Sequence, residues 1–125
     1  MDALKTRISR LDWDKHVQYK VSSFGYVRRK APTEPVLDIR KIVPNVMDFS
    51  LTGLDPEIQT WLKHRPNYTD LITYASAILW AYTRLSIGCS YGRHRSVAVA
   101  ECLAEEIKEA AGIEIMVEHK ELKSV

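Results

Sequence analysis

Apolar residues recur along the chain at two different spacings. In some segments every second residue is apolar, and in others the apolar residues follow a helical period. Alternation predicts strands, and short apolar runs that flank the last helical segment predict two more. Apolar positions three or four residues apart predict helices. The expected strands are Val17–Phe24, Val36–Arg40, RLSIG at Arg84–Gly88 and IEIMVEH at Ile113–His119; the expected helices begin at Pro56 with Asp55 as N-cap, cover Tyr68–Tyr82, and run from His94 to a stop at Gly112.

This order of elements predicts an α/β fold, with residues 1–125 forming a single domain. The sheet is expected to be mixed but mostly parallel, with flanking helices. The C-terminal strand-loop-helix-strand unit is typical of a crossover that joins neighbouring parallel strands. Residues 1–15 are expected to form a polar N-terminal extension that is anchored by Trp13.

The densest group of chemically active side chains is the stretch SIGCSYGRHRS, Ser86–Ser96, between a predicted strand and the last predicted helix. In parallel α/β sheets ligands bind beyond the carboxyl ends of the strands, where loops lead into helix N-termini. Backbone N–H groups and the helix dipole favour an anion there, and an arginine can hold two phosphate oxygens. We therefore expect a phosphate group to bind at Gly88, Cys89, Ser90, Tyr91, Gly92, Arg93, His94, Arg95 and Ser96. The alternative is a tight turn whose polar residues face water.

A second alternative is catalysis, because Cys89, Arg95 and Ser96 have the C-x5-R-S spacing of cysteine-dependent phosphatases. In those enzymes a thiolate attacks phosphorus while an aspartic acid protonates the leaving group. Gly88 stands where they usually have histidine, His94 stands where they usually have glycine, and no aspartate is identified as the acid. Binding without catalysis is the expected activity.

Composition narrows the class of protein. The chain has 125 residues, of which 46% are hydrophobic and 27% charged, as in ordinary globular domains. No apolar run approaches the ~20 residues of a membrane span, and the N-terminal residues lack the apolar core of a signal peptide, so a cytoplasmic protein without membrane contact is expected. Cys89 and Cys102 are expected to be free thiols, and no metal or cofactor is expected.

The net charge of +2 hides an uneven distribution. The last thirty residues are acidic, whereas small basic groups occur upstream. If folding gathers them near Ser86–Ser96, the surface there attracts anions; otherwise they are solvated charges. The candidate RNA-binding cations are Arg28, Arg29, Lys30, Lys120 and Lys123, and a nucleic-acid-binding module without a small ligand is a third alternative.

Five motifs resemble those of one family in order and spacing over roughly a hundred residues. They are SSFGY at Ser22–Tyr26, LDIR at Leu37–Arg40, LTGLD at Leu51–Asp55, IGCSYGRHRSVAVAE at Ile87–Glu101 and EHKEL at Glu118–Leu122. The sequence is similar to the C-terminal domain of the RNase adapter protein RapZ family. The resemblance implies an α/β fold likened to halves of phosphofructokinase, a homodimer, and a pocket for a sugar phosphate such as glucosamine-6-phosphate. It also implies a sensor and adapter that binds small RNAs and presents them to a ribonuclease, rather than a catalyst.

The same resemblance extends the candidate site. The family loop is matched by Gly88, Cys89, His94, Arg95 and Ser96, and the family's D-x-R is matched by Asp38 and Arg40. A histidine near the end of the family domain corresponds to His119. The family's usual arginine and histidine appear here in reversed order, as His64 and Arg65. Tyr91 replaces a glycine, so the ligand can differ from the family's amino sugar. The nucleotide-binding loop G-x-x-x-x-G-K-[ST] of full-length members does not occur, so ATP binding is not expected.

Overall fold

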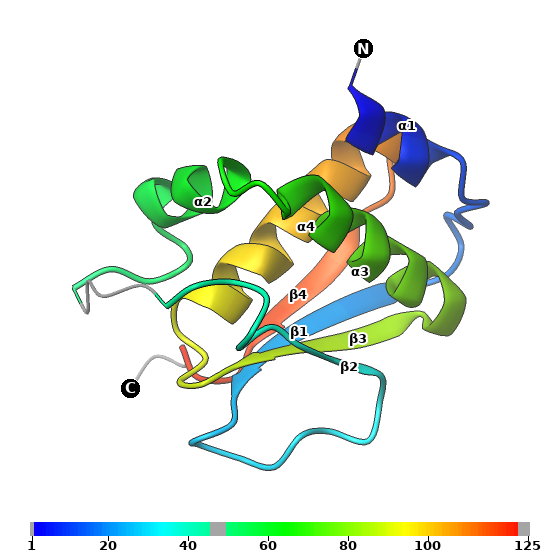
Figure 1. Ribbon diagram of the computed structural model, residues 1–125. Coiled ribbons are helices and arrows are strands. Elements are labelled where there is room, and N and C mark those ends of the chain that lie inside the picture. The colour runs from blue at the N-terminus through cyan, green and yellow to red at the C-terminus, as the bar shows by residue number, and fades with distance from the viewer. Residues whose placement is uncertain (1, 46–49, 123–125) are drawn as a thin grey trace.

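The computed structural model describes residues 2–45 and 50–122 (Figure 1). In this part of the chain the strands are β1 (Tyr19–Gly25), β2 (Val36–Asp38), β3 (Arg84–Cys89) and β4 (Ile115–His119). The helices are α1 (Ala3–Ser9), α2 (Pro56–Lys63), α3 (Tyr68–Tyr82) and α4 (Arg95–Ala111). These elements confirm the α/β class expected from the apolar pattern.

The strands form one four-stranded sheet in the order β2-β3-β1-β4, and every pairing among them is parallel. The expected strand-loop-helix-strand unit exists as β3, α4 and β4. Its two strands are not neighbours, however, because β1 lies between them. Parallel sheets are buried on both faces at their centre, and six of the seven residues of β1 are buried, which suits the strand to this central place.

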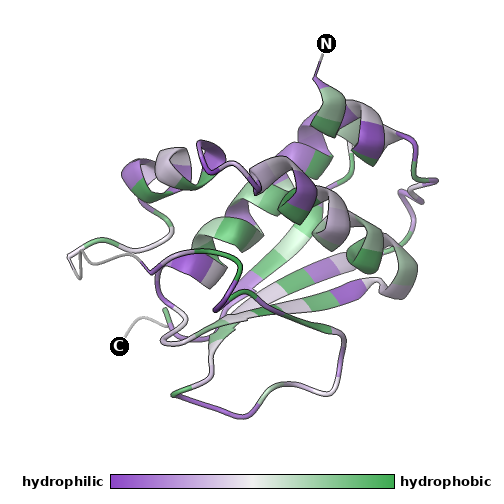
Figure 2. Cartoon of the chain, viewed as in Figure 1, coloured by the Kyte–Doolittle hydropathy of each residue, from purple (hydrophilic) through white to green (hydrophobic). Residues whose placement is uncertain are grey.

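The four helices cover one face of the sheet, and the long loop between β1 and β2 runs below it (Figure 1). In Figure 2 hydrophobic colour runs along β4 and recurs on β1 and β3 beneath the helices. The core between the layers includes Val21, Leu85 and Ile87 from the strands and Ile72 and Leu103 from the helices, all fully buried. Burying each such side chain contributes about 1.5–3 kcal/mol, so this layer supplies much of the driving force for folding.

The N-terminal segment differs from the expected polar extension, because it contains α1 and this helix packs on α3 and α4. Leu4 and Ile8, one helical turn apart, are buried in the main core. Trp13 follows them and donates from Nε1 to the carbonyl of Ile8 at 2.8 Å, in agreement with its expected role as an anchor. A single pair of large apolar residues among many polar ones was too weak a pattern to predict the helix.

The ends of the longer helices follow the sequence signals. α4 stops at Gly112, which takes the left-handed conformation with φ +70°, and α2 has proline at its start. Asp55 precedes α2 as expected, yet its carboxylate accepts from the N–H of Thr52 rather than from the helix. Among the described residues no helix combines the length and the apolar character needed to cross a bilayer.

Candidate functional site

The segment Gly88–Ser96, called the phosphate loop below, leaves the carboxyl end of β3 and enters α4. It is held by the chain that follows β1, since the N–H groups of Tyr26 and Val27 donate to the carbonyls of Cys89 and Ser90, both at 2.9 Å. A Cβ atom on Gly25 would lie 2.3 Å from the carbonyl carbon of Tyr91, so glycine is required for this approach. The loop is therefore fixed by backbone contacts at the expected edge of the sheet.

The thiol of Cys89 lies inside the phosphate loop and is almost fully buried. Its Sγ accepts from the N–H of Gly92 at 3.2 Å and from that of Ser96 at 3.4 Å, and it donates to Ser96 Oγ at 3.1 Å. Two of the backbone donors assigned to a phosphate therefore point at sulfur. The other cysteine, Cys102, is a buried residue of α4, and burial raises the pKa of its thiol to about 11.

A small cavity, called the depression below, opens at this loop with a volume of about 10 Å³. It is lined by Asn45, Cys89, Tyr91, Arg93, His94 and Arg95. This volume suits one water-sized group, so a phosphate would place one oxygen in the depression and keep the others at its mouth.

Arg95 is 5% exposed, and its guanidinium is held by the protein itself. Nη1 donates to the carbonyl oxygens of Arg40 at 3.2 Å and Val43 at 3.1 Å, and Nη2 donates to Ser90 Oγ at 3.2 Å. Arg95 therefore ties the chain after β2 to the start of α4, with only part of its donor set facing the depression.

A larger cavity of about 340 Å³, called the side cavity below, adjoins the depression and shares three of its lining residues. It is lined by Arg28, Tyr91, Arg93 and His94. The sequence grouped Arg28 with the RNA-binding candidates, whereas the fold brings it to the phosphate loop. Two arginines are among the lining residues, and their positive charge favours an anion near this cavity.

Asp38 and Arg40 lie beside the loop and pair with each other. The ion pair is 2.7 Å long, and the Arg40 guanidinium also stacks 3.8 Å from the ring centre of Tyr26. Hydrogen bonds from Arg40 lower the pKa of Asp38, while burial and the charge of Asp38 raise the pKa of Tyr26. Neither member of the pair lines the depression or the side cavity.

His119 lies on β4 and contacts residues other than those of the phosphate loop. Its Nδ1 is 2.6 Å from Ser23 Oγ, and its Nε2 is 2.6 Å from a carboxylate oxygen of Glu101. His64 and Arg65 follow α2: the first bonds to the carbonyl of Thr60 at 2.8 Å and the second lies over the Trp61 ring at 5.6 Å. The linings of the depression and the side cavity include none of these three candidates.

Glu121 is a site residue that sequence reasoning missed. Its side chain is 7% exposed; it accepts from the N–H of Gly25 at 3.1 Å and from Arg29 at 2.7 and 3.1 Å. Burial raises the pKa of this carboxyl, but the hydrogen bonds from Arg29 and Gly25 outweigh burial and the pKa lies below its usual value. The position falls within the EHKEL motif, which was the signal that could have identified it.

Ion pairs with glutamates engage two of the RNA-binding candidates. Arg29 is held by Glu121, and Lys120 forms an ion pair with Glu118 at 3.1 Å. Lys30 is exposed, and Lys123 lies outside the described residues. The charges of two candidates are therefore compensated by carboxylates, which weakens their attraction for a phosphate backbone.

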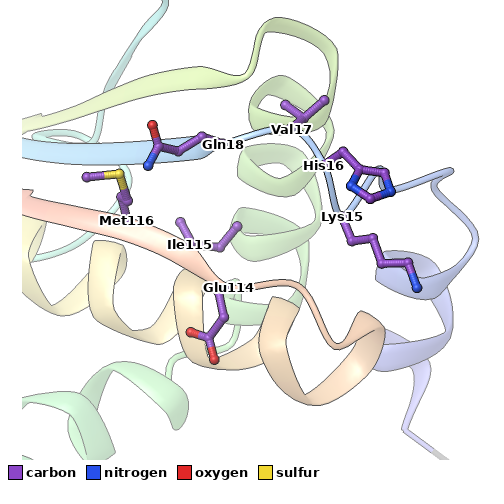
Figure 3. A pocket seen from close by; sticks show the side chains of 7 residues that line it. All are labelled: Lys15, His16, Val17, Gln18, Glu114, Ile115 and Met116. Carbon is purple, nitrogen blue, oxygen red and sulfur yellow. The ribbon is translucent and has the colours of Figure 1, made fainter.

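Another cavity lies at the opposite end of the sheet, where the chain enters β1 and β4 (Figure 3). It measures about 410 Å³ and is lined by Lys15, His16, Val17, Gln18, Glu114, Ile115 and Met116. Ligands of parallel sheets bind at the carboxyl ends of the strands, so this cavity is on the less favourable side. The phosphate loop with its side cavity is the candidate site.

Comparison with known proteins agrees with the motifs. Residues 17–123 match the family model described as the RapZ C-terminal domain. The chain is 34% identical over 128 residues to a nucleotide-binding protein of Shewanella halifaxensis, covering 89% of this chain and 44% of the relative. It is 33% identical over 131 residues to one of Rhodospirillum rubrum (90% and 40%) and 35% identical over 112 residues to one of Thermus thermophilus (78% and 41%).

The chain thus spans less than half the length of these relatives. The match covers the sheet and the phosphate loop. The chain belongs to the RapZ C-terminal domain family.

Proposed function

We propose that this domain binds a phosphorylated small molecule and acts as a sensor or adapter rather than as a catalyst. The observation that carries the proposal is the side cavity, in which Arg28 and Arg93 flank the phosphate loop at the start of α4. One phosphate oxygen would enter the depression, and the guanidinium groups and the helix dipole would balance the charge of the others.

The geometry also explains why the loop is suited to binding. Its backbone is held by the chain after β1 and its interior is filled by Cys89, so the loop is already ordered before a ligand arrives. Preorganisation lowers the entropic cost of binding. Arg95 then acts as a positioning residue that holds the chain after β2 against the loop.

Titration calorimetry with glucose 6-phosphate, glucosamine-6-phosphate and inorganic phosphate tests this proposal. Arg28→Ala combined with Arg93→Ala should weaken binding at least tenfold, because both charged donors are removed. Arg10→Ala, on the exposed segment after α1, is the matched control and should leave affinity unchanged. Equal affinity in the double variant and the control would refute the site.

A cysteine-dependent phosphatase is the second candidate, and the observation in its favour is the Cys89 Sγ, which receives two backbone N–H groups inside the loop. Against it, the described lining of the depression and the side cavity contains no carboxyl group to protonate a leaving group. Hydrolysis of p-nitrophenyl phosphate that disappears in Cys89→Ser would establish the phosphatase, whereas ligand binding that survives Cys89→Ser supports the binding module.

The adapter role extends the proposal to macromolecules: RNA, a ribonuclease partner and a second copy of the chain. Of the candidate RNA-binding cations in the described part, Arg28 and Lys30 are exposed and form no salt bridge with a carboxylate, and the affinity for RNA should fall steeply with salt. Light scattering would give the number of copies. RNA binding that persists after Arg28→Ala with Lys30→Ala would place the RNA surface elsewhere.

A further inference from the structure

We infer that the exposed side of α3 is a surface on which a second copy of the chain docks, with the two α3 helices packed antiparallel about a two-fold axis. The inference rests on the part of the proposed function that gives the domain a second copy. It adds the surface and the packing of the two copies, and it does not depend on phosphate binding.

Helix α3 carries almost no charge, although one side of it faces solvent. Asp70 is the one charged residue among the 15 residues of this helix, whereas α4, with 17 residues, has six. A helix that is apolar all round is typical of positions that other protein covers. Figure 2 shows green and pale colours on the last turn of α3, where the helix ends at Tyr82. The exposed side of α3 is therefore a candidate for a protein interface.

Four exposed residues of α3 follow one another at intervals of four, three and four, and they are called the exposed row below: Asp70, Tyr74, Ala77 and Ala81. These intervals place the side chains on one side of the helix and are typical of a seam between two helices. Tyr74 is 60% exposed, and the next two members of the row are alanines. A partner helix must therefore offer a small residue opposite this tyrosine.

The exposed row is complementary to itself. In an antiparallel pair that is centred between Tyr74 and Ala77, the tyrosine of each copy faces the alanine of the other, so a large side chain packs against a small one twice. A parallel pair would set the two tyrosine rings against each other and leave the alanines without contact. Because two-fold dimers use self-complementary patches, the exposed row fits a second copy of this chain.

Charge at the two ends of α3 favours the same antiparallel packing. Beside the N-terminal end, Arg7 pairs with Asp70 at 3.3 Å, and both side chains remain exposed. At the C-terminal end, the last turn contains no basic residue to balance the negative end of the helix dipole. An antiparallel partner brings its own Arg7 toward that end, so the charges of the two copies complement each other.

The aromatic side chains on this side of α3 set the expected strength of the dimer. Tyr74, Trp80 and Tyr82 are 60%, 37% and 64% exposed, and at roughly 150–250 Å² for each whole side chain they offer about 240–400 Å² per copy. The rings of two copies therefore bury at most ~800 Å², below the roughly 1,200–2,000 Å² of stable complexes. We expect a reversible dimer with a dissociation constant in the micromolar range or weaker.

Sedimentation velocity at a series of protein concentrations measures this dissociation constant. Ala77→Arg places a charge in the seam of both copies and should weaken the dimer at least tenfold. Ala31→Arg, the same change in the exposed loop after β1, is the matched control and should leave the dimer unchanged. Tyr74→Ala should also weaken the dimer. Tyr74→Ala combined with Ala77→Tyr again sets a large residue opposite a small one, and this swapped variant should return to within threefold of wild type.

Each result bears on a different part of the inference, and circular dichroism checks that every variant is folded. A dimer that is unchanged in Ala77→Arg would overturn the α3 surface and leave the second copy in place. A wild-type chain that stays monomeric at every concentration would overturn both and point to another protein as the partner of α3. A swapped variant as weak as Tyr74→Ala would overturn the antiparallel packing. Calorimetry with inorganic phosphate is a separate measurement, and Ala77→Arg should match wild type there, because the described linings of the depression and the side cavity include no residue of α3.

Discussion

The carboxylate of Glu121 receives two hydrogen bonds from the guanidinium of Arg29, at 2.7 and 3.1 Å, across a sequence separation of 92 residues. The same carboxylate accepts from the N–H of Gly25. This contact joins the chain after β4 to the chain after β1 beside the phosphate loop. It is an ion pair whose acidic member is buried, so its removal should have a measurable cost.

We expect Glu121→Gln to lower the free energy of unfolding at pH 7 by about 1–3 kcal/mol, as for other buried hydrogen-bonded charges. The pKa of Glu121 is lowered in the folded state, so its stabilisation is present above the unfolded-state pKa and is lost as pH falls through the folded-state pKa. Urea titrations from neutral to acidic pH should therefore show the variant and the wild type converge at low pH. Glu114→Gln, on an exposed pair with Lys108, is the control; an equal pH dependence in both variants would contradict this assignment.

Gly92→Ala and Gly112→Ala form a second matched pair, since both glycines have positive φ, +74° and +70°. A Cβ on Gly112 meets nothing within 4 Å, so this variant should lose only the ~1–2 kcal/mol of left-handed strain. A Cβ on Gly92 would lie 2.6 Å from the nitrogen of Gly25, which adds about 1–3 kcal/mol of overpacking. Chemical denaturation measures the difference. An equal loss in the free energy of unfolding for the two variants would show that the loop accommodates the Cβ atom at residue 92 without overpacking.

Arg95 and Arg93 are two residues apart, yet they should behave differently. Arg95→Ala removes three hydrogen bonds from a buried guanidinium, and we expect a loss of ~3 kcal/mol or more in the free energy of unfolding. Arg93→Ala should stay within ~0.5 kcal/mol of wild type because its one described bond, to the carbonyl of Glu121, is long at 3.5 Å. Thermal unfolding compares the two. A stable Arg95→Ala would mean that its carbonyl contacts contribute little.

His119 should prove structural. Ser23→Ala, His119→Gln and the double variant form a thermodynamic cycle, and we expect a coupling of about 0.5–3 kcal/mol between two contacting residues. His119→Gln should also leave the affinity for phosphate compounds unchanged, because the residue lines neither site cavity. A weakened affinity in a folded His119→Gln variant would show that this histidine contributes to the ligand site.

Local patterns predicted α2, α3 and α4 well because each carries its own periodicity or end signals, whereas α1 was missed. The apolar spacing defined α3 at Tyr68–Tyr82, and Gly112 marked the end of α4. The neighbours of β1 could not be predicted, because alternation within a strand does not encode which strand pairs with it. The phosphate loop was singled out by its composition and by its place between a strand and a helix, and its binding of phosphate stays a prediction. Its neighbours Arg28 and Glu121 come from distant segments, so their contacts beside the loop become visible only in the fold.

The central place of β1 has a consequence for synthesis. β1 is translated before both strands that flank it, and its last neighbour, β4, emerges nearly a hundred residues later. Until then one row of its backbone N–H and carbonyl groups has no partner and can pair with another chain. A ribosome-bound fragment ending before β4 should therefore be prone to aggregation.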